Sequence, residues 1–217
     1  MIKHNKYKII VSSLVTILPL FIGLILWNKL PDKIVTSFGW SGEANGYNSR
    51  AFAVFGLPLI LLLVNLICII ATSADPRRKN ISNGMFSLVI SIVPICSVIC
   101  GVCIYGNAMG YVLKVENIMS IFIGVLFIVL GFILPRCKQN YTIGIKLPWT
   151  LHDEDNWNKT HKLAGKVWII GGVVMVFVGL LQSKVLFFSV IAALVLIPTV
   201  YSFLLYKNNN QSLWSDT

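Results

Sequence analysis

Six apolar runs of nearly membrane-spanning length restrict the fold of this chain more than any other feature. A helix rises about 1.5 Å per residue, so about 20 apolar residues cross a hydrocarbon core roughly 30 Å thick. Barrel strands alternate apolar and polar residues over about 10 positions, whereas these runs are apolar all round. The predicted spanning helices are Ile9–Trp27, Ala51–Ala71, Met85–Tyr105, Ile118–Leu134, Leu163–Leu181 and Val185–Tyr206.

Composition supports the same fold class. Hydrophobic residues make up 56% of the 217 residues and charged residues 12%, and the mean hydropathy is +0.79. So few charges cannot cover a soluble globule of this length. We therefore predict an all-α, polytopic integral membrane protein with six transmembrane helices. It is expected to be one domain, 1–217, made of an amino-terminal module (1–105, with an outer loop at 28–50) and a second part (106–217, with a cytoplasmic loop at 135–166).

The basic residues predict the orientation, because Lys and Arg are retained on the cytoplasmic side of membrane helices. If the six runs alternate in direction, 13 of the 18 Lys and Arg residues fall on one side, in the amino terminus, 77–79, 136–166 and Lys207. Both termini are therefore expected to be cytoplasmic, and the outer loop to face outward. The formal net charge of +10 is then a topology signal rather than a sign of direct nucleic-acid binding.

The interiors of the predicted spans contain no Asp, Glu, His or Arg, which are the usual marks of proton relays, ion paths and voltage sensors. This disfavours a pump or a coupled transporter. Prolines inside spans either kink helices or break them around a substrate, and kinks are the simpler interpretation of Pro19, Pro58, Pro94 and Pro198.

Small residues in two spans indicate close helix packing. This explains the third-span face of Cys96, Cys100, Cys103, Ser97 and Gly101 more simply than copper binding does. Gly171, Gly172 and Gly179 on the fifth span are likewise expected to let backbones approach closely, with a hinge as the alternative. Because Cys137 lies on the predicted reducing side and the other four cysteines lie within spans, we predict no disulfide framework.

The outer loop is rich in turn signals and aromatic rings. Gly39, Gly42 and the pair Asn45-Gly46 predict turns. The rings either lie at headgroup depth or form an outward recognition surface for a hydrophobic or peptide ligand. The candidate recognition residues of this loop are Pro31, Trp40 and Tyr47.

A polar and aromatic segment, residues 140–165, interrupts the apolar chain and is the main candidate for a specific function. Gly144 and Pro148 predict a turn-rich beginning. Thr150 and Asp153 form a capping-box-like pair, and acidic residues at 153–155 suit the first turn of a helix. This helix should continue without interruption into the fifth span, with Trp157, His161, Ala164 and Trp168 on one face and Asp155 paired with Lys159.

The polar segment has residue types that bind metals, but not their usual spacing. His152 and His161 lie on different faces of a helix, and the helix start explains Asp153 and Asp155. The sequence also has no Ser or Cys nucleophile with a nearby base, no H-E-x-x-H motif and no Gly-rich phosphate loop. We therefore predict a protein that is not an enzyme, with no catalytic residue, metal or cofactor.

Several motifs resemble those of the SdpI family of bacterial membrane proteins. They are Asn140-Tyr141, Gly144-Ile145-Lys146, Pro148-Trp149-Thr150-Leu151, Trp157, Thr160-His161-Lys162 and Gly165. The outer-loop runs LPDKI (30–34) and SGEANGYNSR (41–50) are similar to the small amino-terminal membrane module often joined to that family. The chain departs at Lys146 and Leu147, where the usual motif has Arg and then a polar residue, and at Val35 and Ser37, where Pro and His are frequent. Lys keeps the charge of Arg but not its bidentate fork.

This resemblance implies immunity against a secreted membrane-active toxin peptide of the sporulation-delaying type, in a multi-pass protein of the bacterial cell membrane. In the best-known member it also implies signalling, in which the toxin-loaded protein holds a helix-turn-helix repressor at the membrane. The expected partners are therefore the toxin peptide, the lipid bilayer and a cytoplasmic repressor. A small-solute transporter or channel is the alternative function, followed by a membrane-embedded metal-dependent enzyme. The predicted binding residues are Asn140, Tyr141, Gly144, Lys146, Pro148, Trp149, Thr150, Trp157, His161 and Lys162.

Overall fold

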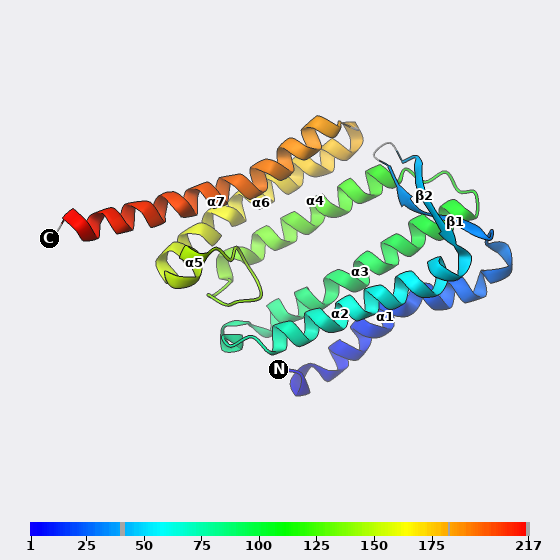
Figure 1. Cartoon of the computed structure of the whole chain (residues 1–217), viewed down its shortest axis with the longest axis horizontal. Helices are drawn as coiled ribbons and strands as arrows, with labels where there is room; N and C mark the ends of the chain where they lie inside the picture. The colour runs from blue at the N-terminus through cyan, green and yellow to red at the C-terminus, as the bar shows by residue number, and fades with distance from the viewer. Residues whose placement is uncertain (40–41, 182, 216–217) are drawn as a thin grey trace. The chain divides into compact units, whose positions relative to one another are not determined.

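Six long apolar helices dominate the structure, as predicted (Figure 1). The computed structural model describes residues 1–39, 42–181 and 183–215, so the candidate residue Trp40 lies outside the described residues. The helices that are long and apolar enough to cross a membrane are Lys6–Ile25, Phe52–Ser73, Asn83–Ala108, Val115–Arg136, Glu154–Leu181 and Lys184–Asn209. The prediction of an all-α, six-span fold is confirmed.

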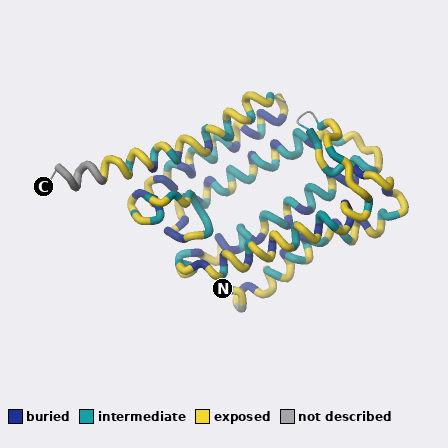
Figure 2. The backbone as a smooth tube through the Cα atoms, viewed as in Figure 1, coloured by how far each residue is buried: buried dark blue, intermediate teal, exposed yellow. Residues whose placement is uncertain are grey.

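The outward faces of these helices are apolar. Exposed positions run along all six of them (Figure 2), and they include Ile70, Val102, Ile170, Phe177 and Val195. Apolar surface of this extent is unfavourable in water and suits contact with lipid.

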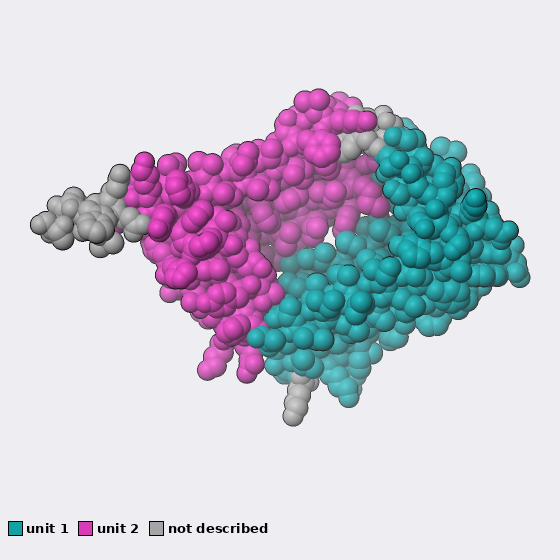
Figure 3. Space-filling model, viewed as in Figure 1, with its two compact units in different colours: residues 1–74, 82–115 teal, residues 75–81, 116–217 magenta. Residues whose placement is uncertain are grey.

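The chain forms two compact units, residues 1–74 with 82–115 and residues 75–81 with 116–217 (Figure 3). Unit 1 contains η1 (Lys3–Asn5), α1 (Lys6–Ile25), η2 (Trp27–Lys29), β1 (Lys33–Phe38), β2 (Ala44–Ser49), η3 (Phe52–Gly56), α2 (Leu57–Ser73) and α3 (Asn83–Ala108). Unit 2 contains η4 (Arg78–Asn80), α4 (Val115–Ile133, with Val115 counted in unit 1), η5 (Leu134–Arg136), α5 (Pro148–His152), α6 (Glu154–Leu181) and α7 (Lys184–Ser215).

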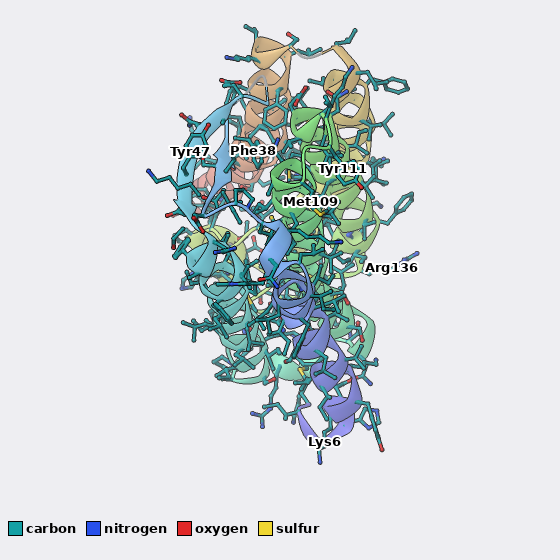
Figure 4. All side chains as sticks on the ribbon, turned by 90° about the vertical axis from the view of Figure 1, so that its right-hand side faces the viewer. Lys6, Phe38, Tyr47, Met109, Tyr111 and Arg136 are labelled. Atoms are coloured by element: carbon teal, nitrogen blue, oxygen red, sulfur yellow. The ribbon has the colours of Figure 1, made fainter. Side chains whose placement is uncertain are left out.

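The outer loop contains an antiparallel β-hairpin, which the sequence analysis described only as a loop with turns. Figure 4 shows Phe38 and Tyr47 on this hairpin, at the opposite end of unit 1 from Lys6. The turn predicted at Gly39 and Gly42 is present: the Gly39 amide donates to the Glu43 carbonyl at 2.7 Å, and Gly42 has a φ of 77°.

The turn predicted at Asn45-Gly46 is wrong, because both residues lie in β2. Gly46 faces Ser37 where the strand register is irregular, and a Cβ on Gly46 would lie 3.1 Å from the Ser37 Cβ. Glycine therefore relieves crowding between the strands at this position.

Arg50 connects the base of the hairpin to η2. Its guanidinium donates to the carbonyls of Trp27 (2.8 Å) and Leu30 (3.0 Å), pairs with Asp32 at 2.7 Å, and lies 4.7 Å from the centre of the Trp27 ring. Ile34 on β1 is buried with Leu30 against the ends of the unit 1 helices.

Three of the four prolines inside the spans do not interrupt their helices: α1, α3 and α7 run through Pro19, Pro94 and Pro198. Pro58 lies in the first turn of α2, directly after η3. Pro94 has no N–H, so the carbonyl of Ile90 loses its helical donor. Ser12 on α1 donates to that carbonyl at 2.6 Å, and Asn65 on α2 donates to the Ser12 hydroxyl at 2.9 Å. The carbonyl that Pro94 leaves free is therefore part of a hydrogen-bonded network that connects α1, α2 and α3.

Glycines on α4 and α6 let these two backbones touch. A Cβ on Gly172 would lie 2.6 Å from the Gly124 carbonyl oxygen, and a Cβ on Gly165 would lie 2.7 Å from the Gly131 carbonyl oxygen. Because the residues on each helix are seven apart, they recur on one face and form a seam, which we call the glycine seam.

The glycines singled out on the fifth span therefore divide between two neighbours. Gly172 and Gly179 face α4, where Gly179 lies against Ser120, whereas Gly171 faces Leu194 on α7. Gly165, a third glycine of α6 that faces α4, was noted in the sequence only as part of a motif.

The glycine seam predicts different costs for two adjacent substitutions. Gly172→Ala should destabilise the protein by about 1–3 kcal/mol, because its Cβ meets the backbone of α4. Gly171→Ala should cost less, because its Cβ meets side-chain atoms of Leu194 and no backbone of α7. Thermal unfolding in detergent measures both, and an equal loss of Tm would show that backbone contact is not the limiting feature.

Candidate functional site

The polar segment folds as a loop, a short helix and the start of a long helix. The loop 137–147 follows η5, α5 follows the loop, and α6 begins at Glu154 and continues to Leu181. The prediction of an uninterrupted helix into the fifth span is confirmed. We call the loop, α5 and the beginning of α6, residues 137–162, the loop corner.

The long helix is capped by Asp153 rather than by Thr150. One carboxylate oxygen of Asp153 accepts from the amides of Asp155 (2.8 Å) and Asn156 (3.1 Å). Thr150 lies in α5, where the turn ends before α6 begins. The spacing of Thr150 and Asp153 therefore resembled a capping box, but Thr150 lies within α5, whereas Asp153 caps α6. The predicted pair of Asp155 and Lys159 is present at 2.7 Å.

Asn140 organises the beginning of the loop. Its side chain is fully buried, and its carbonyl oxygen accepts from the amides of Thr142 (2.9 Å) and Ile143 (2.7 Å). Its amide nitrogen donates to the carbonyl of Lys138 at 2.8 Å. A single side chain thus satisfies three backbone groups that no helix or strand would pair.

His161 holds the middle of the loop against α6. Its Nε2 accepts from the Ile145 amide at 2.9 Å, and its Nδ1 lies 2.8 Å from the Trp157 carbonyl. These contacts assign the neutral tautomer with the proton on Nδ1, since Nε2 must be free to accept. A Cβ on Gly144 would lie 2.4 Å from Nε2, and Gly144 has a φ of +120°, so only glycine fits there.

Trp157 connects His161 to the end of η5. Its ring stacks on His161 with 4.0 Å between centroids, and its Nε1 donates to the Cys137 carbonyl at 2.7 Å. The predicted face of Trp157, His161, Ala164 and Trp168 was expected to meet either the bundle or the membrane. Its first three residues are buried, and Trp168 is half-buried and donates to the Leu194 carbonyl at 3.0 Å, so the face meets the bundle.

Cys137 is a buried thiol at the same junction. Burial raises the pKa of Cys137 to about 11, against a smaller lowering by the Asn140 side chain. The thiol is therefore neutral near pH 7, as expected for a structural rather than a reactive cysteine.

Thr150 closes the loop onto α5. Its hydroxyl accepts from the Leu147 amide at 2.9 Å and lies 2.8 Å from the Ile145 carbonyl oxygen. The Thr150 carbonyl accepts from the side chain of buried Gln139 at 2.8 Å. This residue therefore fixes both ends of the segment 145–150.

The connection between α2 and α3 supplies residues that the sequence analysis missed. Asp75 is buried, and one of its carboxylate oxygens accepts from the Tyr141 amide at 2.9 Å and from the Thr142 hydroxyl at 2.5 Å. Arg77 donates to the Gln139 side chain and lies 4.9 Å from the centre of the Tyr141 ring. The available signal was an acid in an Asp-Pro turn before a basic run, which was used only for orientation.

Trp149 packs on α7 at the other side of the loop corner. Its Nε1 donates to the Ser202 hydroxyl at 3.0 Å, and its ring is stacked with that of Tyr206. The Ser202 carbonyl accepts from Asn156 at 2.9 Å. Ser202 was also missed, because an isolated serine in an apolar run has no recognisable pattern.

The predicted binding residues of the polar segment separate into a framework and a surface. Asn140, Thr150, Trp157 and His161 are buried, and Gly144 and Trp149 are half-buried. Tyr141, Lys146, Pro148 and Lys162 are exposed. The loop corner is thus a rigid base that presents these four side chains. In the outer loop, Pro31 and Tyr47 are exposed on unit 1.

These features define a helical multi-pass membrane protein with a structured polar corner. Within the described ranges, no group of three or more His, Cys, Asp or Glu residues is placed to hold a metal ion. What the loop corner offers is a fixed surface of one aromatic ring, one proline and two lysines, which suits recognition.

The SdpI/YfhL protein family model matches residues 136–202, and the domain of unknown function DUF1648 matches residues 14–62. The chain is 25% identical over 214 residues to "Immunity protein SdpI" of Bacillus subtilis (strain 168), covering 94% of this chain and 99% of that protein. No solved structure matches the chain significantly. The resemblance to the SdpI family, with the amino-terminal module joined to it, is confirmed, and the loop corner lies in the SdpI/YfhL segment.

The contacts of Thr150 predict a local effect of its hydroxyl. Thr150→Val keeps the shape but leaves the Leu147 amide without its acceptor, so it should loosen the loop at a cost of about 1–3 kcal/mol. Thr150→Ser keeps the hydroxyl and is the matched control. Hydrogen exchange should accelerate in residues 139–151 of the Val variant and remain near the native rate in the Ser variant. Equal exchange in both would show that this hydroxyl does not hold the loop.

Proposed function

We propose that this chain is an immunity protein of the bacterial cell membrane, which protects a cell from a secreted membrane-active toxin peptide. The observation that carries the proposal is the alignment with an immunity protein over nearly the whole length of both chains. The alignment includes the loop corner, where the motif residues have specific hydrogen-bond partners and are not simply apolar span residues.

The loop corner supports recognition of a peptide or protein. Its framework residues leave few backbone groups free to rearrange, and the exposed side chains of Tyr141, Lys146 and Lys162 stand on that framework. A rigid surface binds with a smaller loss of conformational entropy than a flexible one. The buried residues Trp157 and His161 would then act by positioning the loop.

The proposal extends to the predicted orientation and to signalling. With both termini cytoplasmic, the toxin would meet the outer loop and the spans, and a helix-turn-helix repressor would meet the loop corner. The continuous helix α6 supports a connection, since it runs from the loop corner through the fifth span. Such coupling requires two states that differ in their affinity for the toxin.

A protection assay tests the function directly. A sensitive host that carries this chain should survive the cognate toxin, whereas a host without it should not. His161→Ala and Trp149→Ala should abolish protection while membrane insertion is retained, because each removes a contact that holds the loop corner. Full protection by both variants would contradict the role of the loop corner. Solute uptake by proteoliposomes instead of protection would favour a transporter or channel.

Substitutions of three exposed lysines distinguish a recognition surface from an effect of net charge on protection. Lys146→Gln and Lys162→Gln should each reduce protection about tenfold, the effect of a lost contact worth about 1.4 kcal/mol. Lys159→Gln removes the same charge from a residue paired with Asp155 outside the candidate set, and it should protect normally. Equal effects of all three substitutions would indicate net charge and not a recognition surface.

Thiol labelling of intact cells tests the orientation. Cysteine introduced at Asn45, which is exposed in β2, should react with an impermeant reagent, and cysteine at Asn158, which is exposed in α6, should stay protected until the cells are lysed. The reverse pattern would place the loop corner outside, where it would meet the toxin directly.

A further inference from the structure

A groove runs between the amino-terminal halves of α1 and α3 in unit 1. Its volume is about 660 Å³, within the range of roughly 300–1,000 Å³ typical of small-molecule sites. The apolar part of its wall is formed by Val11, Val15, Ile90, Pro94 and Ile95. One end is different, because Tyr7, Lys8, Ser87 and Ser91 line it with polar groups.

Lys8 is the charged group at the polar end. Its ammonium donates to the Ser87 hydroxyl at 2.7 Å, which holds the side chain over the groove. An ammonium has three donors, so Lys8 can hold Ser87 and an oxygen of a bound anion at once. Residues 1–31, 44–74 and 82–115 contain no Asp or Glu, so the two acids of unit 1, Asp32 and Glu43, belong to the hairpin end. Within unit 1, the polar end of the groove therefore carries positive charge, and the acids of that unit lie on the hairpin.

The length of the groove matches one leaflet of a bilayer. From Tyr7 to Val15 the α1 axis advances about 12 Å at 1.5 Å per residue. Half of a hydrocarbon core is about 15 Å thick. Because α1 begins at Lys6, the polar end lies where the chain enters the membrane, and the apolar wall extends into the hydrocarbon.

The shape of the groove follows from the helix contact already described. The hydroxyls of Ser87 and Ser91 donate to the carbonyls one turn back in α3, at 2.8 and 2.7 Å, so these side chains lie close to their own helix. Ser12 bonds to Ile90 across the contact and holds α1 and α3 together at the floor. Small side chains above a fixed floor leave the space open.

We propose that this groove binds one anionic phospholipid, with the headgroup phosphate at Lys8 and one acyl chain along the apolar wall. The polar end supplies charge complementarity to a phosphate, the wall is complementary to a hydrocarbon chain, and their separation fits a single leaflet. The site is independent of the toxin and of the proposed immunity function.

Lipid retention by the purified full-length protein tests the site. Native mass spectrometry in detergent compares phosphatidylglycerol with phosphatidylcholine of the same acyl chains. The protein should retain the anionic lipid preferentially, and Lys8→Gln should reduce its retention about fivefold, the contribution of one lysine near an anionic headgroup. Lys6→Gln removes an equal charge from an exposed residue that does not line the groove, and it should retain the lipid as the native protein does.

A second pair of variants tests the apolar wall. Ser91→Phe should fill the groove and abolish retention, whereas Leu14→Phe adds a ring to an exposed position of α1 outside it and should have no effect. If Lys8→Gln also lowers the Tm in lipid-free detergent, the comparison of Ser91→Phe with Leu14→Phe tests lipid binding in the groove independently of Lys8. Equal retention of both lipids, equal losses from the two lysine variants, or full retention by Ser91→Phe would overturn the proposal.

Discussion

Backbone polar groups in apolar surroundings must find partners, and this requirement underlies most of the specific contacts in the structure. At several points where the helices leave a carbonyl without a helical partner, a side chain from another element supplies one. Ser12 donates to the carbonyl freed by Pro94, and Arg50 donates to two carbonyls in and directly after η2. These hydrogen bonds also determine which helices are neighbours. The interactions that avoid the cost of an unpaired backbone group therefore also define how the helices pack.

The same requirement explains how an irregular loop stays ordered beside the spans. Residues 137–147 have no helix or strand to pair their backbone, yet Asn140, Asp75 and His161 accept from four amides of the loop. Each partner is buried, which strengthens its hydrogen bonds and makes their loss costly. The loop corner therefore depends on a few side chains from distant parts of the sequence, and they fix the backbone of the loop that leads to Lys146.

Features with a local cause were predictable from the sequence. The six spans follow from composition and length, and α6 follows from the acids at its start and the apolar stripe behind them. Features that depend on a partner far away in the sequence were not predictable. The roles of Asp75 and Ser202 depend on their contacts with Tyr141 and Trp149. The spacing of residues in the sequence does not indicate these contacts. Asn45-Gly46 has the composition of a turn, but strand pairing with Ser37 decides its place.

The glycine seam also limits how such a chain can change in length. The seam fixes Gly131 against Gly165, and within two turns the chain reaches Cys137, whose carbonyl must meet Trp157. One inserted residue in that stretch would rotate Cys137 by about 100° around the α4 axis and separate the pair. Related chains that keep the seam and the loop corner should therefore share one length between them.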